Sequence, residues 1–333
     1  MKAFTLDQYG KKTKLQLTEM AQPVVGENDV LVQIHSASVN PIDFRIKHGD
    51  FKLLLPHKMP LILGHDLAGV VVKVGSAVHS FKVGDEVYAL PPSDKIGTFA
   101  EYIAIDESYV ALKPKNLTLE EAASIPLVGL AVWQVLVEKV DLKRGQKVFI
   151  QAGSGGVGTF AIQLAKHIGA YVATTTSADN FEWVKKLGAD VVIDYKKDDF
   201  ETILKDYDVV LNSQNSETLQ KSMRILKLGG KIVSISGPPD VDFARQIKAN
   251  WLIKIVMHFI SRKIKMTAKK LGVHYSFLFT RAHGEQLAQL TSLIKAGVIK
   301  PVIDKVFPFL ETNEAMEYVE AGRSKGKVVI KVR

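Results

Sequence analysis

Six residues near the middle of the chain have the types and the spacing that can hold a phosphate group. The apolar run 148–152 before them predicts a buried parallel strand. From the end of the motif onward, residues 157–168 have the spacing of a helix that Gly169 ends. Glycines at such a turn let the backbone approach a pyrophosphate, whose charge is stabilised by free N–H groups at the helix start. A dinucleotide-binding turn is therefore predicted, in preference to a glycine-rich turn that binds nothing. The six residues form a G-x-G-x-x-G: Gly153, Ser154, Gly155, Gly156, Val157 and Gly158.

The end of the next predicted strand, 171–176, bears on the choice of cofactor. Enzymes specific for NAD usually place an acid there to bind the ribose diol, whereas this strand ends in three threonines followed by Ser177. Asp179, with Glu182 three residues later, fits a helix N-cap pair better than a ribose ligand. Ser177 among small neighbours suits a 2′-phosphate, so the sequence favours NADPH (NADP) over NADH.

The elements that position these residues form a βα alternation. Short Val- and Ile-rich runs alternate with helical patterns at 181–187 and 217–226, which is typical of a parallel sheet with helices on both faces. The fold class is therefore α/β, a doubly wound parallel sheet of the Rossmann kind. The predicted strands are 148–152, 171–176, 191–193, 209–211, 231–236 and, after a long helical segment, 273–280.

The chain before the glycine turn is mostly β. Strands are predicted at 30–34, 68–74, 86–89 and 99–105, and residues 120–140 are predicted to be helical. After the parallel sheet come a helix at 285–296 and a strand at 327–332. This tail is too small for a core of its own, so it should pack on the N-terminal part.

Composition excludes several classes of protein. The chain of 333 residues is long enough for two domains and contains no cysteine, which removes disulfides and thiolate metal ligands. The net charge of +9 comes from scattered lysines, with only 262–270 dense, and predicts no nucleic-acid binding. The start of the chain lacks the apolar core of a signal peptide, and no apolar run is long enough to span a bilayer. A cytoplasmic protein is the simplest expectation.

The segment 251–271 is a basic amphipathic helix by its pattern. Such a helix can lie on a membrane surface, where it could guide lipid-soluble substrates. More often its apolar face covers the protein's own core or a dimer partner, and that is the interpretation favoured here. The face consists of Trp251, Leu252, Ile255, Val256, Phe259, Ile260 and Ile264.

Taken together, eight short sequence motifs resemble those of the zinc-independent quinone oxidoreductase and enone reductase branch of the medium-chain dehydrogenase/reductase superfamily. The resemblance implies a GroES-like β-rich catalytic domain made of 1–123 and 281–333, and a Rossmann dinucleotide-binding domain at 124–280. The words are SVNPIDFRIKHG (38–49), LGHDLAGVV (63–71), FKVGDEVYA (81–89), GTFAEY (97–102), EEAASIPL (120–127), QAGSGGVG (151–158), LGADVVIDY (187–195) and GKVVIKV (326–332).

The zinc enzymes of this superfamily differ from the present sequence at their metal ligands. They hold zinc with a Cys, the His of a GHE word and a third ligand, whereas here Asn40 stands at the Cys position and only His65 is kept. Because catalytic zinc needs three protein ligands, we expect a metal-free enzyme. His65 is then expected to be a turn residue, hydrogen-bonded in the domain interior.

The resemblance also implies site residues. Asn40 and Asp43 would approach the nicotinamide, with Arg45 or Lys47 facing the substrate cleft. For Asp43, a turn in which the side chain bonds local backbone is an equal alternative. The hydroxyl residue of the family's GLTAW word is replaced by Ala131. The implied cofactor contacts are Asn40, Gly153, Ser154, Gly155, Gly156, Val157, Gly158, Ser177, Tyr195, Ile235, Ser236, Phe279 and Lys327, of which Tyr195 would line the 2′-phosphate.

The resemblance implies an NADPH-dependent oxidoreductase acting on small hydrophobic quinones or α,β-unsaturated ketones and aldehydes. Hydride would add to the β-carbon of an enone or to a quinone ring, with Arg45, a backbone N–H or the cofactor ribose hydroxyl stabilising the enolate, and solvent supplying the second proton. An NADPH-binding sensor with little turnover is the alternative, and a zinc alcohol dehydrogenase is disfavoured by the missing cysteines. A homodimer paired through the apolar segment 275–279 is expected, with no nucleic-acid partner and no stable membrane insertion.

Overall fold

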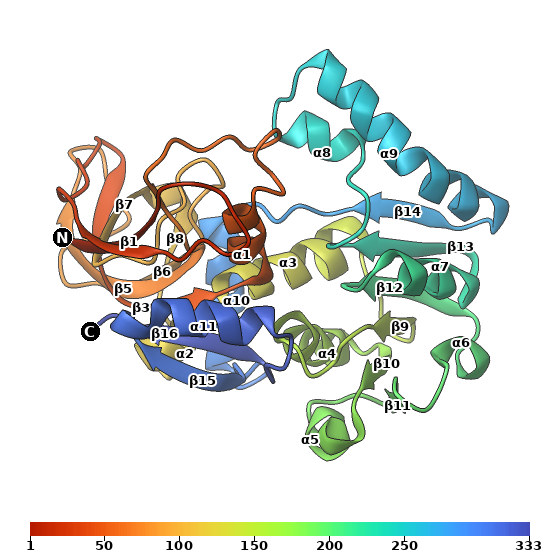
Figure 1. Cartoon of the computed structure of the whole chain (residues 1–333). Helices are drawn as coiled ribbons and strands as arrows, with labels where there is room; N and C mark the ends of the chain where they lie inside the picture. Colours follow the sequence, from red (N-terminus) through yellow and green to blue (C-terminus); the bar gives the residue numbers. More distant parts are fainter. The chain divides into compact units, whose positions relative to one another are not determined.

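The computed structural model describes residues 1–333, which divide into two compact units: 1–130 with 281–333, and 131–280. Each unit contains its own sheet and core (Figure 1). The assignment of the discontinuous unit as the catalytic domain stays a prediction.

The unit formed by 131–280 is built on a six-stranded, all-parallel sheet with the strand order β11-β10-β9-β12-β13-β14. Phe149, Val210 and Ile232 are direct neighbours across three central strands and are fully buried, as expected for a sheet covered on both faces. The predicted α/β fold class is confirmed. The strands are β9 (Lys147–Ile150), β10 (Tyr171–Thr176), β11 (Val191–Asp194), β12 (Tyr207–Asn212), β13 (Leu226–Ser234) and β14 (His274–Phe277).

The helices of this unit alternate with its strands. The helix that follows the glycine turn has an apolar inner face and ends at Gly169, whose φ of 90° is the left-handed conformation that glycine adopts without strain. The helices are α4 (Gly156–Ile168), α5 (Phe181–Lys186), α6 (Phe200–Ile203), α7 (Ser216–Arg224), α8 (Val241–Gln246) and α9 (Trp251–Lys270).

The other unit is mainly antiparallel. Its seven-stranded sheet has the order β15-β16-β3-β5-β6-β8 with β7 also paired to β3, and a smaller sheet has the order β2-β1-β4. The strands are β1 (Lys2–Leu6), β2 (Gln16–Glu19), β3 (Asp29–Val39), β4 (Leu61–Ile62), β5 (Asp66–Val74), β6 (Glu86–Ala89), β7 (Tyr102–Asp106), β8 (Val110–Leu112), β15 (Ile303–Pro308) and β16 (Lys327–Lys331).

The C-terminal tail is part of this unit, as predicted. Strand β16 lies between β15 and β3, and its Val328 and Ile330 are buried in a cluster with Phe4 and Val39 from the start of the chain. The helices here are α1 (Pro41–His48), α2 (Leu119–Ala123), the start of α3 (Pro126–Trp133), α10 (Gly284–Lys295) and α11 (Thr312–Glu320).

Two predicted elements differ in the structure. Residues 120–140 are not one helix, because Pro126 has no N–H and disfavours helical backbone at the residue before it, so α2 ends at Ala123 and α3 begins at Pro126. A π-helical turn, Gln134–Lys139, then follows α3. The N-cap prediction for Asp179 is also wrong: Asp179 lies within a 3₁₀ turn, Ala178–Asn180, and the N-cap residue of α5 is Asn180.

Candidate functional site

The glycine turn joins β9 to α4 and leaves room only for glycine at two positions. A Cβ atom at Gly158 would overlap the carbonyl oxygen of Ala152, and one at Gly153 would overlap the Thr174 side chain. Helix α4 begins at Gly156 and its N-cap, Gly155, has no side chain to accept from the first amides. Those amides have no partner within the helix, so the turn presents free donors of the kind that bind a pyrophosphate.

The predicted cofactor residues of this unit lie at one edge of the sheet. The glycine turn follows β9, Ser177 follows β10, Tyr195 follows β11, and Ile235 and Ser236 follow β13. Phe279, two residues beyond β14, completes the row. Because all six strands are parallel, these residues share the carboxyl edge, which is where ligands bind in open α/β sheets.

The end of β10 carries no acid. Ser177 Oγ accepts a hydrogen bond from Asn180 Nδ2 at 2.9 Å, and Asn180 is buried and also accepts from Trp183 Nε1 at 3.0 Å. The hydroxyl of Thr176 is buried without a partner. On the neighbouring strand, the Tyr195 N–H donates to Thr176 O at 3.3 Å, and the Tyr195 side chain is 61% exposed. The hydroxyl of Ser177, the exposed phenol of Tyr195 and the unpaired hydroxyl of Thr176 thus lie at the strand ends where the adenosine ribose and its 2′-phosphate are predicted to bind.

The acid at the end of the neighbouring strand, β11, accepts a hydrogen bond from the chain that follows it. Asp194 ends β11 and is buried, and its Oδ1 accepts from the backbone N–H of Lys196 at 3.1 Å. Lys196 and Lys197 follow with exposed side chains that form no ion pair. Two exposed carboxylates, Asp198 and Asp199, come next, so the chain beyond β11 exposes charges of both signs, with the two cations nearer the strand end.

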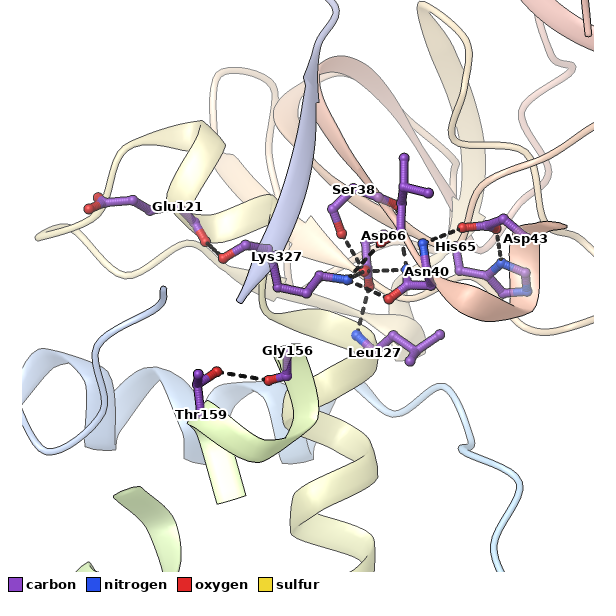
Figure 2. A network of polar contacts seen from close by, with 12 residues as sticks. Ser38, Asn40, Asp43, His65, Asp66, Glu121, Leu127, Gly156, Thr159 and Lys327 are labelled. Carbon is purple, nitrogen blue, oxygen red and sulfur yellow. Dashed lines mark hydrogen bonds and ion pairs between the residues drawn. The ribbon is translucent and has the colours of Figure 1, made fainter. Parts of the chain in front are cut away.

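The other unit contains a buried polar network around the carboxylate of Asp66 (Figure 2). Asp66 begins β5 and is fully buried; its Oδ2 accepts from Ser38 Oγ at 2.6 Å and from Asn40 Nδ2 at 2.7 Å. Its Oδ1 accepts from the backbone N–H of Leu127, at the start of α3, at 2.7 Å. A carboxylate at a helix N-terminus is stabilised by the helix dipole as well as by the hydrogen bond.

Lys327 supplies the cation of this network. Its Nζ lies 3.2 Å from Asp66 Oδ2 and 3.3 Å from Val39 O, and it also donates to Asn40 Oδ1. The side chain of Lys327 is 6% exposed and that of Asp66 is fully buried. The three hydrogens of the ammonium thus have three acceptors within the chain, and the side-chain amide of Asn40 is fixed between Lys327 and Asp66.

Asp43 and His65 form a second buried pair beside Asn40 (Figure 2). Asp43 Oδ2 accepts from the backbone N–H of Asn40 at 2.7 Å, the reciprocal contact at the start of α1, and Asp43 Oδ1 lies 2.6 Å from His65 Nδ1. Both predicted features are present: Asp43 bonds local backbone, and His65 is a buried, hydrogen-bonded residue just before β5. An approach of Asn40 or Asp43 to a nicotinamide stays a prediction.

The two remaining predicted side chains lie outside this network. Arg45 Nε pairs with Asp50 at 3.2 Å, and its guanidinium lies over the Phe51 ring at 4.7 Å. Lys47 is buried and its Nζ donates to Lys11 O at 3.1 Å. The structure therefore gathers Asn40, Asp43 and Lys327, but not Arg45 or Lys47.

Comparison with known proteins places these features in a family. Residues 26–115 match the family model of the alcohol dehydrogenase GroES-like domain, and 187–330 match that of zinc-binding dehydrogenases. The human mitochondrial NAD(P)H oxidoreductase RTN4IP1 is 38% identical, with 100% of this chain and 89% of that protein covered. The chloroplastic NADPH-dependent alkenal/one oxidoreductase of Arabidopsis thaliana is 35% identical, with 99% and 79% covered.

A solved structure gives the same result. The quinone oxidoreductase of Coxiella burnetii superposes with a TM-score of 0.86 at 31% identity, with 100% of this chain and 99% of that one covered. The chain belongs to the quinone oxidoreductase branch of the medium-chain dehydrogenase/reductase superfamily. The resemblance noted from the sequence is thereby confirmed, and the protein is a member of an oxidoreductase family.

The zinc of some dehydrogenases in this superfamily does not fit the residues of this member. No group of three or more His, Cys, Asp or Glu side chains lies together as metal ligands would. Of the residues that the resemblance places at zinc-ligand positions, His65 is hydrogen-bonded through Nδ1 to Asp43, and the side chain of Asn40 is bonded to Asp66 and Lys327.

The residue that sequence reasoning missed is Asp66. It stands in the word LGHDLAGVV, which supported the resemblance without a role for this acid. Its position gave no clear signal, because Glu86 also begins an apolar strand and is exposed; a carboxylate requires donors and a cation only once it is buried. Lys327 was expected as a cofactor contact, and the structure gives it this carboxylate as its partner.

Proposed function

We propose that this protein is an NADPH-dependent oxidoreductase that reduces α,β-unsaturated ketones and aldehydes or quinones. The observation that carries the proposal is the carboxyl edge of the parallel sheet. There the glycine turn offers free amides, and β10 ends in Ser177 without an acid. The named activities of the human, Arabidopsis and Coxiella relatives support the same chemistry.

The choice of NADPH over NADH rests on charge. A carboxylate at the end of β10 would repel a 2′-phosphate, and none lies on the strand or at Ser177, the next acid in the chain being the exposed Asp179 in the following 3₁₀ turn. Ser177 and Tyr195 offer hydroxyl groups to the phosphate, and Lys196 offers a cation. Proteins bind phosphate groups through hydrogen-bond donors and cationic side chains of this kind.

Bound NADPH would supply the hydride, which adds to the β-carbon of an enone or to a quinone ring while the cofactor becomes NADP⁺. The chain's own contribution is to bind and orient. Because the side chains of Asn40 and Lys327 are occupied by each other and by Asp66, we assign them to holding the backbone at 39–41 in place. The enolate oxyanion that forms would then be stabilised by a backbone N–H, by the cofactor ribose hydroxyl, or by Arg45 after it leaves Asp50. Solvent would supply the second proton.

Two further parts of the proposal concern the protein's setting. The expected homodimer would use β14, which is the edge strand of its sheet. We retain a cytoplasmic location as the proposal, although relatives include mitochondrial and chloroplastic proteins. No helix is long and apolar enough to cross a bilayer.

The test of cofactor choice is Ser177→Asp, measured with NADPH and NADH against a panel of 1,4-benzoquinone, 9,10-phenanthrenequinone, a 2-alkenal and a cyclic enone. Aspartate is a favourable residue before a helical turn, so the variant should fold. We expect KM for NADPH to rise at least about tenfold through repulsion of the 2′-phosphate, with KM for NADH unchanged or lower.

The matched control is Tyr171→Asp, which places the same charge at the opposite end of β10. It should leave the ratio of NADPH to NADH efficiency unchanged. Equal use of both cofactors by wild type and Ser177→Asp would contradict the assignment of the phosphate site. NADPH binding without turnover of any substrate would favour a sensor or binding protein.

A further inference from the structure

Helix α9 exposes an apolar surface that its own unit does not cover. The side chains that face the protein are Met257, Ser261, Ile264 and Ala268, at the spacing of one helical stripe. Of the face that was expected to cover the protein's own core or a dimer partner, only Ile264 is buried, so cover by the chain's own core is wrong for the rest of the helix, and cover by a partner stays a prediction. The exposed large side chains of α9 are Trp251, Leu252, Ile255, Val256, Phe259, Ile260 and Met266.

The exposed apolar residues are concentrated in the first half of α9. Trp251 is 67% exposed and Phe259 is 62% exposed, and both lie within the segment 251–260. The second half of the helix is anchored, because Ile264 and Ala268 belong to the core cluster around Phe149. In Figure 1, α8 and α9 lie beside β14, at the β14 end of the six-stranded sheet. A contiguous apolar surface of this kind marks an interaction site.

The charge of α9 indicates the chemistry of the partner. The helix contains no Asp or Glu among its 20 residues. One of its cations, Lys265, pairs with Asp240 at 3.4 Å, whereas the other five form no ion pair. The cations are Lys254, Arg262, Lys263, Lys265, Lys269 and Lys270.

The positions of these cations match an interfacial helix. Stepping 100° per residue places Arg262, Lys263, Lys269 and Lys270 on the same outward half of the helix as the apolar side chains. A helix that carries apolar and cationic side chains on its free side inserts the former below the headgroups of a bilayer and holds the latter at anionic headgroups.

A second copy of this chain is a poorer occupant of the surface. A two-fold contact would bring two such helices together, each with six cations and no acid, so like charges would meet. We propose that α9 is an interfacial helix through which the protein binds reversibly to bilayers that contain anionic lipids.

The test is flotation of the full chain with vesicles of phosphatidylcholine alone or with about a third of phosphatidylserine, without cofactor. We expect binding at least about tenfold tighter to the anionic vesicles, and loss of most of this preference in 0.5 M salt, since salt screens the headgroup charge. Because vesicle binding is measured without NADPH, its outcome is independent of the test of the proposed function.

The decisive variants change exposed residues only. Ile255→Ser with Phe259→Ser removes apolar contact, and Lys263→Glu with Lys270→Glu reverses charge; each pair should lower anionic-vesicle binding at least about tenfold with NADPH affinity unchanged. The matched controls are Leu228→Ser, 83% exposed elsewhere in the same unit, and Lys186→Glu on α5, which should bind as wild type does.

Two results would overturn the proposal. One is equal or absent binding of wild type to both kinds of vesicle. The other is a dimer in light scattering that the Ile255→Ser/Phe259→Ser variant converts to monomers, which would assign the surface to a second copy of the chain.

Discussion

At the scale of single residues, Asn40 links the two buried carboxylates of the discontinuous unit. Its backbone N–H donates to Asp43, its Nδ2 donates to Asp66, and its Oδ1 accepts from Lys327. A buried carboxylate with this many donors is held in one position, and so is the backbone that it bonds. We therefore propose that the network is a positioning device, whose members act on the reaction through the chain segment that they hold.

Replacing Lys327 tests this assignment. Lys327→Met leaves the Asp66 carboxylate buried without its cation, so we expect a loss of about 3–5 kcal/mol in the free energy of unfolding, measured by urea denaturation. We also expect a fall of at least about tenfold in kcat/KM, because Asn40 loses one of its fixed partners.

The control for this prediction lies on the same strand. Lys331 pairs with Glu120 at the surface, where its side chain is 54% exposed, and Lys331→Met should cost less than about 1 kcal/mol. Equal effects of the two substitutions would show that the buried network has no special role.

Single residues were predicted unevenly from the sequence. The glycines and Ser177 follow from local rules, because a tight turn and a strand end impose their requirements on neighbouring positions. The Asp66–Lys327 pair joins residues 261 positions apart. No local pattern carries that information, and the two side chains come together because β3 pairs with both β16 and β5.

At the scale of elements, the site depends on the register of the parallel strands. Strands β9, β10 and β12 must end together for the glycine turn to stand beside Ser177, and the ladder pairs Val148 with both Val172 and Val209. Asp208 supports this register, since its Oδ2 accepts from the backbone N–H of Lys147 at 2.8 Å and it pairs with Lys227.

Asp208 gives a prediction about pH. Burial opposes ionisation of its carboxyl, but the hydrogen bonds from Lys227 and from the Lys147 amide outweigh burial and hold its pKa below the ordinary value of 3.8. A lowered folded pKa stabilises the protein above the unfolded pKa, and this stabilisation is lost as pH falls through the folded value. Asp208→Asn should therefore cost about 1–2 kcal/mol at pH 7, and the difference from wild type should shrink as the pH falls below 3.8.

Urea unfolding at pH 7, 5 and 3 measures this difference. Asp206→Asn is the control, because Asp206 is exposed, forms no ion pair and has a φ of 60° that suits asparagine. A difference for Asp208→Asn no larger than that for Asp206→Asn at pH 7 would show that the ionised carboxylate does not stabilise β9 against β12.

The helices and strands were predicted well where the apolar residues follow a single hydrophobic period. The parallel strands and α4 follow from apolar runs and a glycine stop, whereas the break at Pro126 was missed within an apolar stretch. The exposure of α9 was kept only as the less favoured alternative, because an apolar stripe has the same spacing whether it covers a core or stays exposed.

At the scale of the whole molecule, the chain has two compact units, to which we assign separate tasks. The unit 131–280 presents the carboxyl edge of a parallel sheet for a dinucleotide, and the unit of 1–130 and 281–333 contains the buried network at Asn40. Composition and the βα alternation predicted two domains and the return of the tail to the first one. Composition and hydrophobic periodicity do not specify the substrate, since many different apolar side chains would accept the same class of carbonyl compound.

The most direct measurement of the central claim is hydride transfer from NADPH deuterated at C4, using both stereoisomers, to a 2-alkenal. Mass spectrometry and NMR should find deuterium on the β-carbon of the saturated product with one stereoisomer and not the other, while the α-hydrogen comes from solvent. If the protein binds NADPH but reduces neither the alkenal nor 1,4-benzoquinone, the account of it as an oxidoreductase of these compounds is wrong.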